Sequence, residues 1–461
     1  MRRLLSAAPL LAITLLASTV AAKGASDAHH ARGTANLFWF MHISDLHIGA
    51  SSIEDPKQKA TPHTKKALEE VVGVLSPSFV MATGDLTDGS AGVVPTAGQQ
   101  QDEWDLYRKL YEDAGMTADF YFDVPGNHDA YGESGGLGYF IANALQGTAT
   151  GKTYSSWSVQ VPEGEVLFFG LNSAGTGAAV FTNPPGEFPE DTLEHFESTL
   201  KAHPSARLVV VVAHHPLSGS AGADRVVEGF KSMGGGFYLH GHVHSYEEYL
   251  DGEGQVVVNQ INSLGKGDTN NVGVVAYDHN ALVYRATGIE KPWPFVSITA
   301  PVAARLRDGD ESPYRYPVCK DRKDNPVRAL VFSDSPITIV SVRVGDGPTL
   351  LMNRSEPDSP VFVADVDTSQ LEAGMHGLKV VAKTATDEAS QEIEVEFVAG
   401  PCEELPIDPT GNGGAGGGGG SSGSAGAAGA AGTGGVAGSA GTGGAGGKAG
   451  ASGGSGGGTG G

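Results

Sequence analysis

A set of carboxylate, amide and imidazole side chains follows short apolar runs of the chain. The set comprises Asp45 and His47 in HISDLH, Asp85 in ATGD, Asn127, His128 and Asp129 in VPGNHD, His214 in VVVVAHHP, and His242 and His244 in YLHGHVH. A single aspartate in such a place is commonly a helix cap or a turn residue. Together, however, these oxygen and imidazole donors, with no matching set of cysteines, suit first-row divalent metals better than calcium, and they outnumber the ligands of one tetrahedral ion. The sequence therefore predicts two divalent first-row transition metals, such as Mn, Fe or Zn.

The apolar runs are typical of buried strands, and helix-like segments alternate with them, which predicts an α/β layered domain with covered sheets. The predicted strands are residues 37–43, 79–83, 120–124, 166–171, 208–213, 236–240, 256–261 and 272–277. The predicted helices are residues 64–75, 102–113 and 191–202. Ligand groups converge on loops at the carboxyl ends of strands in an open α/β sheet, and five such loops carry the donors.

The pattern changes after residue 288. Residues 292–405 contain short alternating runs separated by turn residues, with strands predicted at 337–344, 361–366, 378–384 and 392–398, which favours a β-sandwich. Residues 406–461 form a Gly/Ala/Ser-rich tail, and 28 of the 68 glycines fall in 411–461. Such a segment has almost nothing to bury, so we expect it to be disordered. It is either a spacer in or beyond the cell envelope or a drift in composition without a selected role.

The chemistry-bearing blocks resemble one family. The ordered blocks Asp45-x-His47, Gly84-Asp85, Gly126-Asn127-His128-Asp129, His214-x-Pro216 and Gly241-His242-x-His244 resemble the calcineurin-like metallophosphoesterase superfamily over residues 37–288. The resemblance implies a four-layer αββα metallophosphoesterase sandwich. The stretches FWFMHISDLHIG and ATGDLTDG further resemble the phosphoesterase domain of the eukaryotic transmembrane protein 62 group, in which an Ig-like domain follows. The stretch LEAGMHGLKVVAKTATDE fits that continuation, so residues 292–405 are expected to be an all-β Ig-like sandwich.

The resemblance also implies a role for each residue of the set. The roles it implies are one metal held by Asp45, His47 and His244, a second metal held by Asn127, His214 and His242, and Asp85 as the bridge between them. His128 is expected beside the ions, where it contacts the phosphoryl group or protonates the leaving oxygen, and Asp129 is expected to orient His128 or to pack structurally. Two such ions can supply a metal-bound hydroxide near neutral pH for in-line attack on phosphorus.

Residues close to these positions leave several choices open. His214 and His215 point in opposite directions if both lie on a strand, and the family's His-x-Pro pattern selects His214. His42 and His240 lie within predicted strands, as core residues or as supports for the ligands. Asp88 stands three residues after the predicted bridging aspartate, where purple acid phosphatases carry the tyrosine that binds ferric iron. A tyrosinate-coloured iron site is therefore not expected.

The amino-terminal residues predict export. Residues 1–22, MRRLLSAAPLLAITLLASTVAA, combine two arginines, an apolar stretch and small residues before Lys23, which predicts a cleaved signal peptide and then a linker over 23–36. An uncleaved membrane anchor is the alternative, and no later stretch is apolar enough to span a bilayer. The mature chain is then extracytoplasmic: periplasmic, bound to the cell envelope or secreted. In that compartment Cys319 and Cys402 favour a disulfide over two buried thiols.

The expected function is therefore that of an exported phosphoesterase acting on a phosphate mono- or diester. The chain has 53 acidic and 30 basic side chains and a formal net charge of −23, which disfavours nucleic acid as a partner. Residues 86–101 and 130–156, expected to line the cleft, contain a single basic residue, Lys152, so a nuclease is less favoured than an enzyme for small esters. The alternative is a non-enzymatic cell-surface module whose Ig-like domain binds a partner and whose metal is structural. His128 favours the enzyme, because a structural metal site has no need for it.

Overall fold

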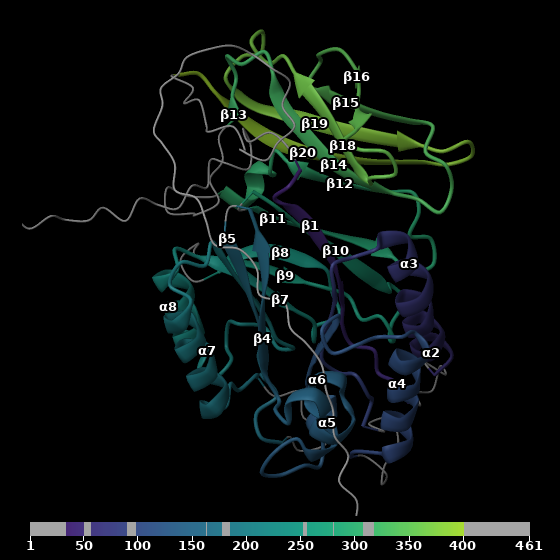
Figure 1. The fold of residues 1–461 in the computed structure, drawn as a ribbon, viewed down its shortest axis with the longest axis vertical. Helices are drawn as coiled ribbons and strands as arrows, with labels where there is room; N and C mark the ends of the chain where they lie inside the picture. The colour runs from purple at the N-terminus through teal and green to yellow at the C-terminus, as the bar shows by residue number, and fades with distance from the viewer. Residues whose placement is uncertain are drawn as a thin grey trace, which may run out of the picture. The chain divides into compact units, whose positions relative to one another are not determined.

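A computed structural model describes residues 34–49, 57–89, 98–162, 164–177, 185–251, 256–279, 281–307 and 318–400. The predicted signal peptide and the predicted tail lie outside these residues, as does the linker apart from residues 34–36. The described chain consists of an α/β region followed by an all-β region (Figure 1). Among the described residues, no helix combines the length and the apolar character needed to cross a membrane.

The α/β region alternates strands with helices over most of its length. Its elements are β1 (Leu37–Ile43), α2 (Lys57–Lys66), the π-helix η1 (Ala67–Val71), α3 (Val72–Leu75), β2 (Val80–Thr83), α4 (Gln101–Asp113), β3 (Tyr121–Val124), the 3-10 helix η2 (His128–Ala130), α5 (Gly138–Asn143), α6 (Leu145–Thr150), β4 (Ser155–Val161), β5 (Gly164–Gly170), α7 (Glu190–Ala202), β6 (Leu208–Val212), α8 (Ala223–Ser232), β7 (Gly236–His240), β8 (Glu247–Asp251), β9 (Val256–Gln260), β10 (Asn271–Asp278) and β11 (Ala281–Gly288).

Two sheets pack face to face in the centre of this region. The first has the strand order β11-β10-β1-β2-β3, and the second has the order β4-β5-β6-β7-β9-β8. Buried side chains of both sheets fill the space between them, and Phe40 packs on Phe79 of its own sheet and on Phe168 of the other. Helices α2 to α4 cover the outer face of the first sheet, and α7 and α8 cover the second (Figure 1). The predicted α/β domain with covered sheets is confirmed as four layers, αββα.

Parallel pairing aligns the carboxyl ends of the central strands. Strands β1, β2 and β3 run parallel in the first sheet, as do β5, β6, β7 and β9 in the second. The central strands are apolar on both faces, because helices cover one face of each sheet and the opposite face packs on the other sheet. The buried LVVVV of β6 is an example. The loops that leave these strands are therefore gathered at one edge of each sheet.

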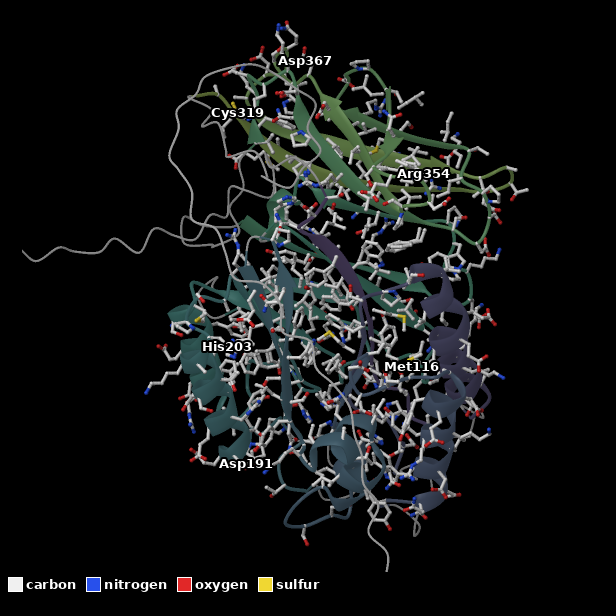
Figure 2. All side chains as sticks on the ribbon, in the orientation of Figure 1. Met116, Asp191, His203, Cys319, Arg354 and Asp367 are labelled. Atoms are coloured by element: carbon white, nitrogen blue, oxygen red, sulfur yellow. The ribbon has the colours of Figure 1, made fainter. Side chains whose placement is uncertain are left out.

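The all-β region forms two further sheets with no α-helix among its described residues. Its elements are β12 (Phe295–Ala300), the 3-10 helix η3 (Ala304–Arg307), β13 (Val318–Cys319), β14 (Asn325–Phe332), β15 (Ile339–Val344), β16 (Leu350–Leu351), β17 (Asn353–Arg354), β18 (Val361–Val366), β19 (Gly374–Lys383) and β20 (Glu388–Val398). The strand orders are β12-β14-β18-β17 and β13-β20-β19-β15-β16, and buried residues of both sheets share one core. Cys319 lies in β13 (Figure 2), whereas Cys402 lies outside the described residues, so their pairing stays a prediction.

A buried ion pair joins the two regions. Arg328 of β14 donates from Nε and from a terminal guanidinium nitrogen to the two carboxylate oxygens of Asp278 at the end of β10, each over 2.9 Å. Both side chains are at most 1% exposed. His279 also donates from Nδ1 to Asp278 over 2.6 Å. Burial alone would raise the pKa of Asp278, but the charge of Arg328 holds it below its usual range.

Removing one partner of this pair is expected to destabilise the protein strongly. The variant Arg328→Met leaves the carboxylate of Asp278 buried without its charge partner, which costs about 3–5 kcal/mol. We expect the double variant Arg328→Met/Asp278→Leu to recover most of this loss, because no isolated charge remains. Urea unfolding measures both changes, with Arg343→Met, an exposed arginine of β15, as the control. Equal stability of the Arg328 and Arg343 variants would contradict the prediction.

Candidate metal centre

The loops after five strands bring the predicted ligands together. Asp45 and His47 follow β1, Asp85 follows β2, Asn127 follows β3, His214 follows β6, and His242 and His244 follow β7. All seven are buried or half-buried. The structure thus places side chains that are up to 199 positions apart in the chain within hydrogen-bond distance of one another.

The first group of donors surrounds the carboxylate of Asp45. Its Oδ1 lies 3.0 Å from Nε2 of His244 and 3.9 Å from Nε2 of His47, and the two imidazole nitrogens are 3.3 Å apart. Ligand atoms about 2.0–2.2 Å from a shared ion lie roughly 3 Å from one another. These three atoms therefore face one position, in agreement with the predicted first metal.

The second group is built around Nε2 of His214. This nitrogen lies 3.0 Å from Oδ1 of Asn127, 3.1 Å from Nδ1 of His242 and 3.3 Å from Oδ1 of Asp85. The other carboxylate oxygen of Asp85, Oδ2, faces the first group, 3.7 Å from Nε2 of His47. Asp85 therefore offers one oxygen to each group, which is the geometry of a bridging ligand. The mixture of imidazole, carboxylate and amide donors fits two first-row divalent ions.

Hydrogen bonds on the far side of each ring fix how the imidazoles point. Nδ1 of His47 donates to Oδ1 of Asp88 over 2.9 Å, and Nδ1 of His214 donates to the carbonyl oxygen of Thr83 over 2.8 Å. Both bonds turn Nε2 toward its group, where it can ligate a metal once it carries no proton. Asp88 and Thr83 were not among the predicted site residues.

The backbone at the ligands is strained. Eight non-glycine residues of the described chain have a positive φ, and five of them are Asp45 (53°), His47 (49°), Asp85 (49°), His242 (69°) and His244 (58°). L-residues rarely adopt this region, and each such residue costs of order 1–3 kcal/mol. Strain concentrated at these positions is typical of a functional site.

Glycines before the ligands allow the loops to approach one another. A Cβ on Gly126 would lie 2.2 Å from Oδ1 of Asp85, and a Cβ on Gly241 would lie 2.2 Å from Oδ2 of Asp45. Neither position has room for a side chain. The glycines of the GNHD and GHVH blocks are therefore needed by the packing around the two carboxylates.

The carboxylate of Asp85 favours the protonated form of His214. Burial alone would lower the pKa of His214, but the negative charge of Asp85 raises it to about 9. Conversely, the positive charge of His214 contributes to holding the pKa of Asp85 well below its usual range, against the opposing effect of burial. In the metal-free protein near neutral pH, a proton on His214 therefore stands where the second ion would bind.

Metal binding is expected to release this proton. An imidazole must be neutral to ligate, and the pKa of His214 lies near 9, so binding at about pH 7 displaces a proton and apparent affinity rises with pH until that pKa is passed. Calorimetric titration of Mn²⁺ in two buffers of different ionisation enthalpy measures the number of protons released. Identical enthalpies in both buffers would contradict the prediction.

His128 lies beside the two groups without joining either. Its Nδ1 donates to the carbonyl oxygen of Asp88 over 2.8 Å, its backbone N–H donates to Oδ1 of Asp85 over 2.9 Å, and its ring packs against Tyr131. Nε2 lies 3.9 Å from Oδ2 of Asp85, and 15% of the side chain is exposed. The ring therefore presents Nε2 next to the bridging carboxylate, where a reacting phosphate would meet it.

Asp129 holds the backbone instead of contacting His128. Its Oδ2 accepts from the N–H groups of Leu86 and Gly126, and its Oδ1 accepts from the N–H and hydroxyl of Thr87. Burial and the charge of Asp85 raise the pKa of Asp129 to about 7. Of the two roles predicted for Asp129, these contacts support structural packing, because they tie the loop after β2 to the loop after β3.

Three buried histidines that neighbour the ligands, His42, His240 and His215, have hydrogen-bond partners outside the two groups. His42 donates or accepts at Tyr284 and Thr83, each over 2.8 Å, beneath the ligand loops. His240 is buried, with Nδ1 at the carbonyl oxygen of Gly241. His215 has Nδ1 at the hydroxyl of Ser173, and its ring centre lies 4.4 Å from that of His242. Only His214 of the adjacent pair shares a group with Asp85.

The comparisons with known proteins agree with the geometry. Residues 38–246 match the sequence model of the calcineurin-like phosphoesterase family. This region belongs to the calcineurin-like metallophosphoesterases. The chain is 24% identical to transmembrane protein 62 of Mus musculus over 387 residues, which cover 78% of this chain and 55% of that protein. It is 27% identical, over 257 residues, to an Arabidopsis thaliana protein provisionally named a metallophosphoesterase, with 51% and 34% of the two chains covered.

The alignments therefore span about half or less of these two relatives. Among solved structures, the 5'-nucleotidase of Candida albicans is 14% identical, with 57% of this chain and 52% of that chain covered and a TM-score of 0.35.

Proposed function

We propose that this metallophosphoesterase hydrolyses a phosphate mono- or diester with two divalent first-row ions. One observation carries the proposal: seven side chains from five loops converge as two groups of donor atoms, and Asp85 places one carboxylate oxygen in each. A single structural ion needs about four ligands and no shared carboxylate. The family of residues 38–246 supports the same reaction class.

The residues divide the work between binding and proton transfer. Asp45, His47 and His244 would hold the first ion, Asn127, His214 and His242 the second, and Asp85 both. When bound, such a pair supplies a nucleophile from water near neutral pH and stabilises charge on the phosphoryl oxygens. His128 would hold a proton at Nε2 for the leaving oxygen or for the phosphoryl group, and its bond from Nδ1 to Asp88 keeps the ring in that orientation.

The hydrolysis of simple esters tests the proposal. Full-length protein loaded with Mn²⁺ or Zn²⁺ is expected to hydrolyse bis-p-nitrophenyl phosphate, p-nitrophenyl phosphate or both, and to lose that activity when a chelator removes the ions. Comparison of the two rates distinguishes a diesterase from a monoesterase. Folded, metal-loaded protein that turns over neither ester with any first-row metal would overturn the proposal and favour the alternative of a binding module with a structural metal.

We also propose that the enzyme is exported and that the all-β region is an Ig-like domain with which a cell-surface partner could interact. The arginines, apolar stretch and small residues of positions 1–22 support export, and two mainly antiparallel sheets around one core support an Ig-like sandwich. Expression in a bacterial host, followed by fractionation and amino-terminal sequencing, tests export: a mature chain that starts near Lys23 outside the cytoplasm is the expected result.

A further inference from the structure

A lysine reaches the metal centre from a sixth loop, which the sequence pattern did not single out. Lys266 lies between β9 and β10, and its ammonium forms an ion pair with Oδ1 of Asp88. The carboxylate of Asp88 is almost fully buried, whereas 25% of the side chain of Lys266 is exposed. A carboxylate that is buried without a charge partner is strongly unfavourable, so Lys266 supplies a charge that stabilises Asp88 in place.

The same loop is attached to the backbone of the first ligand. The hydroxyl of Ser263 and the N–H of Gly265 both donate to the carbonyl oxygen of Asp45, over 2.7 and 3.0 Å. The N–H of Lys266 donates to the hydroxyl of Ser263, and the side-chain amide of Asn270 donates to the carbonyl oxygen of Lys266. Lys266 therefore projects from a backbone whose position relative to the metal centre is fixed.

Asp88 connects Lys266 to a predicted metal ligand and to the predicted proton donor. Its Oδ1 accepts from Nδ1 of His47, a predicted metal ligand, and its carbonyl oxygen accepts from Nδ1 of His128, the predicted proton donor. Oδ1 also lies 3.5 Å from Nδ1 of His128. A shift of the Asp88 carboxylate would break the hydrogen bond that orients His47 and remove the charge beside His128, and a shift of the Asp88 backbone would also break the bond to His128.

We propose that Lys266 is a positioning residue, whose ion pair with Asp88 holds the rings of His47 and His128 so that each presents Nε2 to the metal centre. The inference rests on the proposed function, because it assigns those two rings their roles. Lys266 acts through Asp88 from the Nδ1 side of His47, away from the nitrogen that faces the first group. A conservative change that keeps the charge should therefore preserve its effect, and a neutral side chain of similar length should not.

Metal binding and kinetics together test the role of Lys266. In Lys266→Met we expect the Kd of the first Mn²⁺, measured calorimetrically on the full chain, to weaken about 10–100-fold, which is the usual effect of losing a group that orients a ligand. We expect kcat for the ester substrate to fall by a similar factor, while KM stays within about twofold, because no contact to substrate is lost. Lys266→Arg should restore both quantities to within about threefold of the parent, since the charge on Asp88 returns.

A matched control and a double variant sharpen the test. Lys59 contacts the carbonyl oxygen of Gly267 in the same loop but not Asp88, so Lys59→Met should leave Kd and kcat unchanged. Asp88→Asn should resemble Lys266→Met, and combining the two should add little, because both break the same pair.

Two outcomes would overturn the inference. Kd and kcat of Lys266→Met equal to those of Lys59→Met would show that the ion pair does not position the site. A raised KM with unchanged kcat and metal affinity would assign Lys266 to substrate contact instead. The calorimetric measurement needs no hydrolysis, so a loss of Mn²⁺ affinity in a protein that cleaves no ester would reject the proposed function and keep the positioning role.

Discussion

Replacing Asp85 with asparagine is expected to remove hydrolysis and one of the two ions. Asparagine can still accept the backbone N–H of His128 through its oxygen, so the loop after β2 keeps that bond. The second carboxylate oxygen and the negative charge are lost, and neither group then has a bridging ligand. Because residues that only orient ligands already account for about 10–100-fold, loss of the bridge should lower kcat more than about 100-fold. Steady-state kinetics and metal analysis by mass spectrometry measure the two losses.

Asp119→Asn provides the matched control for Asp85→Asn. This substitution removes the same negative charge at an exposed position, where the carboxylate of Asp119 accepts a hydrogen bond from the hydroxyl of Thr117. Two ions per chain and parental turnover are expected in this control. An Asp85→Asn protein that binds two ions and retains more than about a tenth of the turnover would show that this carboxylate does not bridge the ions.

Much of the α/β region could be predicted because its central strands are apolar on both faces. Strands β1 and β7 have the predicted bounds, and β2, β3, β6 and β9 differ from them by one residue at one end. Most residues of these strands are buried in the structure, and the predicted ligands lie directly after the carboxyl ends of β1, β2, β3, β6 and β7. The seven predicted ligands follow from this rule and from the resemblance, and the structure brings all seven together.

The strands of the α/β region that the pattern missed lie at sheet edges. Strands β4, β8 and β11 are edge strands of their sheets. An edge strand carries polar side chains where it faces solvent, as in EEYLD of β8 and SSWSVQV of β4, so its apolar signal is weak. Helices α5, α6 and α8 of this region were also missed.

The missed parts of the site have a different cause. The sequence shows that Asp88 stands where purple acid phosphatases carry a tyrosine, but its hydrogen bond to His47 depends on the conformation of the loop after β2. Lys266 lies 178 positions after Asp88, in a loop with no other predicted donor, and only the packing of the two sheets brings them together. The positive φ values of the ligands likewise result from tertiary contacts. Periodicity and motif spacing carry no information of this kind.

Replacing His128 with alanine is expected to slow the reaction while leaving the metals bound. His128 contributes no atom to the two groups of ligand donors, so two ions per chain should remain. General acid catalysis by a positioned histidine typically contributes 10²–10⁴-fold, so kcat should fall by about that factor. The loss should be greater for phenyl phosphate than for p-nitrophenyl phosphate, or for the corresponding diesters, because the poorer leaving group depends more on protonation.

The dependence on leaving group separates the two roles predicted for His128. A histidine that contacts the phosphoryl group stabilises every ester similarly, so His128→Ala would then slow both substrates by the same factor. A histidine that protonates the leaving oxygen gives unequal factors. His203→Ala is the control, because His203 (Figure 2) follows α7, is bonded to Glu165 and has no part in the metal centre. Loss of bound metal in His128→Ala would contradict both roles, since it would make His128 a ligand, and parental turnover of both esters would remove it from the mechanism.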